Sequence, residues 1–299
     1  MSPDTSVEQM AEMTRDAVTA GQRFGLGLKP GMPGEALRDP RRAVLDEIDQ
    51  PGLARIEAPG LVSAQQGMAA HFAERHGPQA GANAIASART SAAILHDEAM
   101  ARFGNGLRQP IGFVERLVLF WSNHFCISVR KGPTVRVVAG AYEREAIRPH
   151  VLGDFAAMLT AVVRHPAMLV YLDNRGSIGP NSRAGINRKR GLNENLAREI
   201  LELHTLGVQG GYTQADVGAL ARMLTGWTVA GPEGRIAPPG AFVFNVNAHE
   251  PGPQTLLGRA YAAGGADQAE AALAGLTLHS STARFIAGKF ARHFVADDP

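Results

Sequence analysis

The feature that most constrains the fold of this chain is one apolar segment that carries ionisable residues. Residues 113–128 read FVERLVLFWSNHFCIS, and their apolar side chains extend nearly all round a helical wheel. A helix without a polar face is normally buried, so this segment predicts a central core helix. Its polar members need partners inside the protein, because an unpaired buried polar group is costly. These members are Glu115, Arg116, Asn123 and His124.

The rest of the chain also favours helices. Apolar spacing and helix-favouring composition predict helices in most segments, whereas residues 134–138 and 241–246 alternate like short strands. We therefore predict a mainly α fold, a multi-helix globular domain with minor short β-strands. The expected helices are residues 7–24, 41–48, 62–76, 80–103, 142–148, 154–163, 167–172, 194–206, 213–227, 266–276 and 281–294.

Composition changes near residue 60. Residues 25–59 are rich in Gly and Pro, so we expect residues 1–60 to form an N-terminal helix and a Gly/Pro-rich segment. Residues 61–299 are then the helical core domain. Residues 174–191 (NRGSIGPNSRAGINRKRG) have five basic side chains, no acidic one and no structural signal. A loop of this length inside a domain is usually functional or mobile.

Charge and cysteine content narrow the class of protein. The formal net charge is +2, from 30 Lys+Arg against 28 Asp+Glu, so nucleic acid is an unlikely partner. The single cysteine, Cys126, excludes an internal disulfide, and we expect it to be a small buried side chain. We find no secretory signal and no apolar run long enough for a membrane span. These features predict a soluble protein of the cytoplasm.

Four stretches together resemble one family, the bacterial proteins catalogued as domain of unknown function 1800. The resemblance implies a largely helical domain of bacterial origin, and it implies no reaction, because the family has no established one. Its members look longer and are often exported, so we expect a chain that is incomplete at its C-terminus and keep the periplasm as the alternative compartment. The stretches are ERLVLFWSNHFCIS (115–128), residues 139–174, residues 191–227 and residues 242–299.

The helix over residues 194–206 carries the first candidate site. Glu194, Arg198 and Glu202 are spaced four apart and share one face, and Glu199 lies at its edge. In one interpretation Glu199 and Glu202 bind a divalent metal or act as acid and base, while Arg198 orients a substrate anion. In the other, Arg198 bridges glutamates in a structural ion-pair ladder. The ladder is the commoner arrangement, and we favour it.

Histidines supply the other metal candidates. His124 becomes a plausible metal ligand if it faces Glu199 or Glu202, since an imidazole and two carboxylates form a known ligand set. We predict that His124, Arg198, Glu199 and Glu202 approach one another. His249, followed by Glu250 in a Gly/Pro-rich loop, either reaches a cleft or satisfies buried backbone.

Further residues are candidates for binding or for structure. The basic loop could receive a phosphate or an acidic partner through Arg183, Arg188, Lys189 and Arg190, although a solvated loop is the simpler interpretation. We expect Thr213 and Asp216 to form a capping box that starts a helix. The residues predicted to have structural roles are Trp121, Asn193, Glu194, Asp216 and Trp227.

Two functions are consistent with this sequence. The first is a binding or assembly protein whose buried polar cluster fixes the core and whose basic loop and Gly/Pro-rich segment contact a partner, such as another bacterial protein. The alternative is a metal-assisted hydrolase that uses His124, Glu199 and Glu202. We favour the binding protein, under which Glu202→Ala should destabilise the fold by stranding a buried Arg198.

Overall fold

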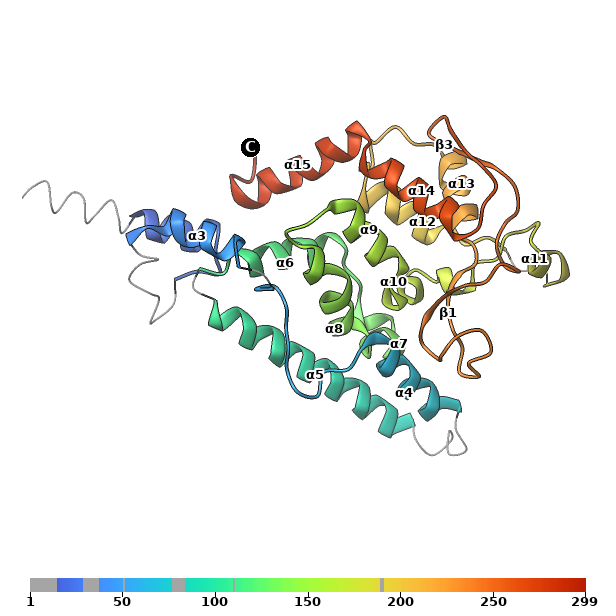
Figure 1. Cartoon of the computed structure of the whole chain (residues 1–299), viewed down its shortest axis with the longest axis horizontal. Coiled ribbons are helices and arrows are strands. Elements are labelled where there is room, and N and C mark those ends of the chain that lie inside the picture. Colours follow the sequence, from blue (N-terminus) through green and yellow to red (C-terminus); the bar gives the residue numbers. More distant parts are fainter. Residues whose placement is uncertain (1–14, 29–37, 51, 77–83, 110, 189–190) are drawn as a thin grey trace, which may run out of the picture.

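The apolar segment forms α6 (Phe113–His124), a central helix with a mostly buried surface (Figure 1). The structure is a computed structural model that describes residues 15–28, 38–50, 52–76, 84–109, 111–188 and 191–299. Within these residues the fold is mainly α, as predicted. The other helices are residues 15–23, α3 (Pro40–Ile48), α4 (Ala64–His76), α5 (Ala84–Arg108), α7 (Pro133–Arg136), α8 (Ala139–Tyr142), α9 (Phe155–Arg164), α10 (Pro166–Tyr171), α11 (Arg183–Arg188), α12 (Asn195–Glu199), α13 (Gln214–Leu224), α14 (Ala266–Thr277) and α15 (Ser280–Phe294).

Shorter turns connect several of these helices. Two are π-helical, η2 (Glu143–Ile147) and η5 (Ile200–His204), and each continues a preceding α-helix. The others are 3₁₀ turns, namely η1 (Val129–Lys131), η3 (Arg148–His150) and η4 (Asn174–Gly176). A π-helical turn is rare and is often found at a functional site, so η2 and η5 mark segments to inspect.

The described strands form two small antiparallel sheets. β1 (Trp227–Val229) pairs with β2 (Phe242–Phe244), which confirms the strand expected near residue 242. β3 (Gln254–Leu256) pairs with β4 (Arg259–Tyr261). The strand expected over residues 134–138 is wrong, because Pro133 occupies the first position of α7, where proline favours a helix.

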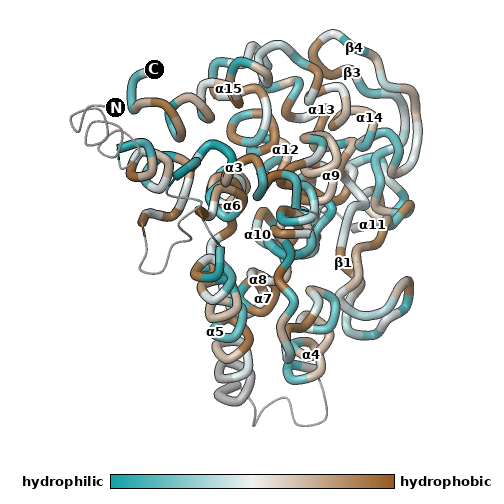
Figure 2. The backbone as a smooth tube through the Cα atoms, turned by 60° about the vertical axis from the view of Figure 1, so that its left-hand side comes forward, coloured by the Kyte–Doolittle hydropathy of each residue, from teal (hydrophilic) through white to brown (hydrophobic). Residues whose placement is uncertain are grey.

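The core lies around α6, α8, α9 and α10. Figures 1 and 2 show these helices between α4 and α5 on one side and α13, α14 and α15 on the other. Trp121 of α6 is buried and packs on Phe155 of α9 and on Phe290 of α15. Aromatic contacts therefore join α15 to the central layer through α6.

Glu47 of α3 holds the start of α6. Its carboxylate is 1% exposed and accepts hydrogen bonds from the backbone N–H groups of Ile111, Gly112 and Phe113 at 2.7–2.8 Å. These N–H groups include donors of the first turn of α6, which have no hydrogen-bond partner within the helix. The negative charge of the Glu47 carboxylate is also favourable at the N-terminus of α6, where the helix dipole is positive. A segment within the first 60 residues is thus bonded to the core, and the proposed division at residue 60 remains a prediction.

We expect Glu47→Ala to destabilise the protein by roughly 2–4 kcal/mol, because it leaves buried backbone donors unsatisfied. The control Asp46→Ala removes an exposed carboxylate of the same helix, paired with Arg42, and should cost less than about 1 kcal/mol. Urea unfolding of both variants measures the difference. Equal losses would show that the contact to α6 contributes nothing beyond a surface pair.

Candidate functional site

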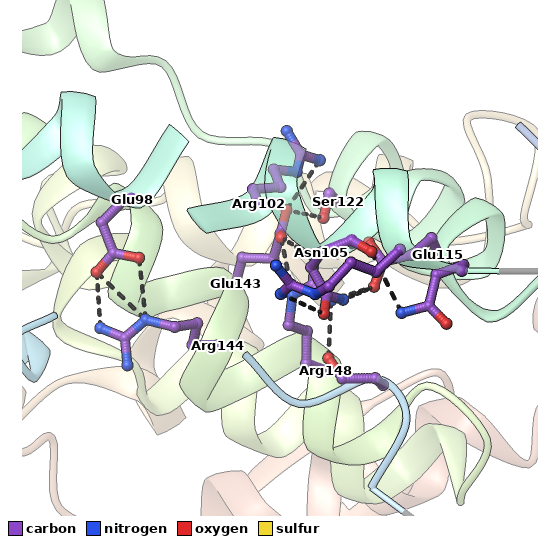
Figure 3. Close-up of polar contacts among 11 residues, drawn as sticks. Glu98, Arg102, Asn105, Glu115, Ser122, Glu143, Arg144 and Arg148 are labelled. Carbon is purple, nitrogen blue, oxygen red and sulfur yellow. Dashed lines mark hydrogen bonds and ion pairs between the residues drawn. The ribbon is translucent and has the colours of Figure 1, made fainter. Parts of the chain in front are cut away.

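The most buried charged group of the site region is the guanidinium of Arg148, whose side chain is 0% exposed (Figure 3). It donates two parallel hydrogen bonds to the carboxylate of Glu115, at 2.7 and 3.0 Å, and two more to Glu143 Oε1. It also donates to the carbonyl of Ala54 at 2.7 Å. Burial alone lowers the pKa of Arg148, but the hydrogen bonds and charges of both carboxylates raise it overall.

The same two carboxylates bind further side chains. Glu143 accepts from Ser122 Oγ at 2.8 Å and forms an ion pair with Arg102 at 2.9 Å, and Glu115 accepts from the Asn105 amide (Figure 3). The network therefore links α5, α6 and the η2 turn with alternating charges. Its charged members have their partners within the network, so its geometry supports a structural role.

The η2 turn sends its other charged side chains to different segments. Arg144 forms an ion pair with Glu98 of α5 at 2.7 Å, separate from the Arg148 network in Figure 3. Glu145 accepts from the backbone of Ala64 and contacts His165 at 3.2 Å. Burial raises the pKa of Glu145, but the bonds from His165 and Ala64 and the Arg144 charge lower it overall.

His124 lies in a second buried cluster, with His204 and Lys289. Its Nε2 is 3.0 Å from the carbonyl of His204, and its Nδ1 is 2.9 Å from Lys289 Nζ. Because an ammonium only donates, Nδ1 accepts and Nε2–H donates, which fixes a neutral imidazole. Burial, followed by the Lys289 charge, lowers the pKa of His124 to about 3. Burial, with His124 and Lys289, lowers the pKa of His204 to about 3 as well.

No hydrogen bond or ion pair among the described residues joins His124 to Arg198, Glu199 or Glu202, the residues predicted to approach it. Both ring nitrogens of His124 are bonded to other groups, and the two glutamates lie on a half-exposed face of α12 and η5. In the part of the chain that the structure describes, no three His, Cys, Asp or Glu side chains are grouped so that they could hold a metal ion. The proposed ligand set of His124, Glu199 and Glu202 is therefore not assembled.

The ion-pair ladder on this helix is present, but it is not buried. The guanidinium nitrogens of Arg198 lie 3.2 Å from Glu194 Oε2 and 3.5 Å from Glu202 Oε1, and the side chain of Arg198 is 40% exposed. The expectation that Glu202→Ala strands a buried arginine is thus wrong. Glu199 is partly exposed, and burial, followed by the charge of Glu202, raises the pKa of its carboxyl. Glu199 and Glu202 therefore remain a carboxylate pair without a histidine.

The His249–Glu250 pair satisfies buried groups, which supports its structural interpretation. His249 is buried, with Nδ1 2.9 Å from the Thr225 carbonyl and Nε2 3.0 Å from the Gly264 carbonyl. The buried carboxylate of Glu250 accepts from the backbone and side-chain nitrogens of Asn181. The pair therefore ties the basic loop to the chain that follows β2.

The basic loop is more ordered than expected, because α11 occupies part of it. Arg183 is exposed on α11. The side chain of Arg188, together with Lys189 and Arg190, falls outside the described residues. Binding by the four basic residues stays a prediction.

Several smaller expectations also meet the structure. Trp227 is fully buried, and it begins β1 rather than ending a helix. Thr213 and Asp216 form the predicted capping box. Asn193 has a structural role, because its Oδ1 accepts a hydrogen bond from the backbone N–H of Asn195 at the start of α12. Cys126 is exposed, so the expectation of a buried thiol is wrong. Asn123 is exposed as well and needs no internal partner.

A family model described as a protein of unknown function (DUF1800) matches residues 19–299. The chain belongs to the DUF1800 family. No curated protein and no solved structure matches it. In the described residues of this DUF1800 protein, no helix combines the length and apolar character needed to cross a bilayer.

Sequence reasoning missed most of this arrangement. The presence of Glu115 in an apolar helix signalled a buried partner, yet nothing in the sequence pattern identified Arg148 as that partner. Glu47 and Lys289 carried no signal, because each lies on a helix of mixed composition.

Two Glu→Ala variants test which arginine is held in the core. Glu115→Ala leaves the buried Arg148 without its bidentate partner and should cost about 3–5 kcal/mol of unfolding free energy. Glu202→Ala takes a carboxylate from the half-exposed Arg198 and should cost less than about 1 kcal/mol. Urea denaturation measures both, and similar losses would contradict the assignment of Arg148 as the core charge.

Stability should fall as the pH drops from about 6.5 towards 3, where neutral His124 and His204 resist protonation in the folded state. The unfolded chain binds those protons, so acid favours unfolding. His204→Phe removes one such group and should flatten the slope by about 1.4 kcal/mol per pH unit. Urea midpoints of the wild type and of His204→Phe between pH 7 and 4 measure this change in slope.

Proposed function

We propose that this protein is a binding or assembly protein that holds a segment of a partner protein in an apolar groove. The groove lies between residues 26–28, the second half of α5 and α6, and its volume is about 300 Å³. Residues 26–28 lie near the start of the Gly/Pro-rich segment over residues 25–59, which the sequence offered as a contact region. The apolar side chains of the lining are Leu26, Leu28, Phe103, Leu107, Ile111 and Leu119.

The exposure of these side chains is the observation that carries the proposal. Phe103 is 68% exposed and Leu107 is 74% exposed, although both are large and apolar. With the exposed Met100 they follow the spacing i, i+3, i+7, so they share one face of α5. Large apolar side chains that gather on a surface mark interaction sites, whereas scattered ones do not.

The occupant that we propose is an amphipathic helix with a carboxylate beside its apolar face. Glu115 supplies the sole carboxylate among the described lining residues, and it is already paired with Arg148. Arg108, next to Leu107, forms no ion pair with any described residue, so the rim keeps an uncompensated positive charge. A helix laid in a groove uses apolar anchors for affinity and flanking charges for orientation.

A peptide-display library of helical sequences tests this function, with the Leu107→Glu variant as the counter-selection target. We expect enriched peptides with leucine-like residues at helical spacing and an acidic flank. Fluorescence anisotropy with the purified peptide should show binding to the wild type that is at least about tenfold weaker for Leu107→Glu. Arg108→Glu should weaken it and reduce its dependence on salt.

The matched control is Leu278→Glu, which places the same charge on an 87% exposed leucine at the junction of α14 and α15. This variant should bind the peptide like the wild type. The proposal fails if no sequence is enriched, or if Leu278→Glu weakens binding as much as Leu107→Glu. It also fails if light scattering shows that a second copy of the chain fills the groove.

A further inference from the structure

A second concave site is lined by residues of α4, α7, α10 and the η4 turn. Its volume is about 340 Å³, within the range of small-molecule pockets. It shares no lining residue with the apolar groove, so it is independent of the proposed function. The charged and polar residues of its lining are Arg75, Lys131, Thr134, Asp173 and Arg175.

The pocket carries an excess of positive charge. Lys131 Nζ and Asp173 Oδ2 lie 2.6 Å apart, so these two charges compensate each other. The guanidinium groups of Arg75 and Arg175 have no ion pair or hydrogen bond with any described residue, and both residues are exposed. Two uncompensated positive charges therefore line one small cavity.

The wall that carries Arg175 is held firmly. The side-chain amide of Asn174, 1% exposed, donates to the carbonyls of Leu224 and Trp227 at 3.2 and 3.0 Å. The carbonyl of Arg175 accepts from Thr228 Oγ1 at 3.0 Å. These bonds fix the backbone of η4 against β1, so the base of the Arg175 side chain is preorganised.

The backbone of this wall is also strained. Asp173 has φ = 59°, the left-handed region that a non-glycine residue rarely adopts, and its carboxylate is held by Lys131. Across the pocket, Gly132 has φ = 141°, a conformation that other residues rarely adopt. Strain of this kind persists where the surroundings over-determine the backbone, and it is common at ligand sites.

We propose that this pocket is a binding site for a phosphate monoester. Guanidinium groups bind phosphate oxygens in pairs of parallel hydrogen bonds. A phosphate monoester carries close to two negative charges at neutral pH, which matches the two uncompensated arginines better than a single carboxylate does. The apolar side chains of Pro133, Val135 and Val170 line the same cavity and suit the organic part of the ester.

Isothermal titration calorimetry with phenyl phosphate tests the site, at an ionic strength matched with sodium chloride. The wild type should show saturable one-site binding. Arg75→Gln and Arg175→Gln should each weaken it at least about tenfold, and the double variant should abolish it. Because neither guanidinium has a partner among the described residues, both variants should keep the melting temperature of the ligand-free wild type.

Arg235→Gln is the matched control, since it neutralises an exposed arginine outside the pocket. It should leave the affinity for phenyl phosphate unchanged. The proposal is overturned if phenyl phosphate shows no saturable binding, or if Arg235→Gln weakens it as much as Arg175→Gln does. It is also overturned if succinate, a dicarboxylate of the same charge, binds as tightly, or if Arg175→Gln lowers the ligand-free melting temperature.

Discussion

The arrangement of the core depends on one buried guanidinium. Arg148, the first residue of η3, reaches the loop at Ala54, the central helix through Glu115 and the preceding η2 turn through Glu143. Removing an arginine and two carboxylates from water is expensive, and only close geometry with several hydrogen bonds recovers the energy. Such a network tolerates one relative position of the helices that it joins, so it specifies packing as well as contributing to stability.

Charges that are fully paired inside the protein are not free for chemistry. The carboxylates around Arg148 accept hydrogen bonds from arginine, serine and asparagine, and His124 is held between Lys289 and a carbonyl. The two binding sites that we propose lie at the surface instead. They are the exposed apolar face of α5 and the pocket that contains Arg75 and Arg175, and this placement supports the proposed binding function.

The sequence predicted local secondary structure better than it predicted which buried polar residues are bonded to each other. The burial of α6, the strand at Phe242 and the capping box at Thr213 each follow from a few neighbouring residues, so periodicity and spacing identify them. The partner of Glu115 lies 33 residues away, and the donors that Glu47 caps lie 64–66 residues away. No local pattern encodes such distances. The predicted metal-ligand set of His124, Glu199 and Glu202 failed for the same reason. Residue spacing shows which side chains share a helix face, but it does not show which other helix packs against that face.

The π-helical form of η2 has a consequence for how this segment can vary in length. A π-helical turn holds one more residue than an α-helical turn, and one residue rotates a helix by about 100°. Deleting a single residue between Glu143 and Ile147 would restore regular α-helix and swing Arg148 away from Glu115. Homologous chains that keep this core should therefore show no insertion or deletion here, even where nearby loops differ in length.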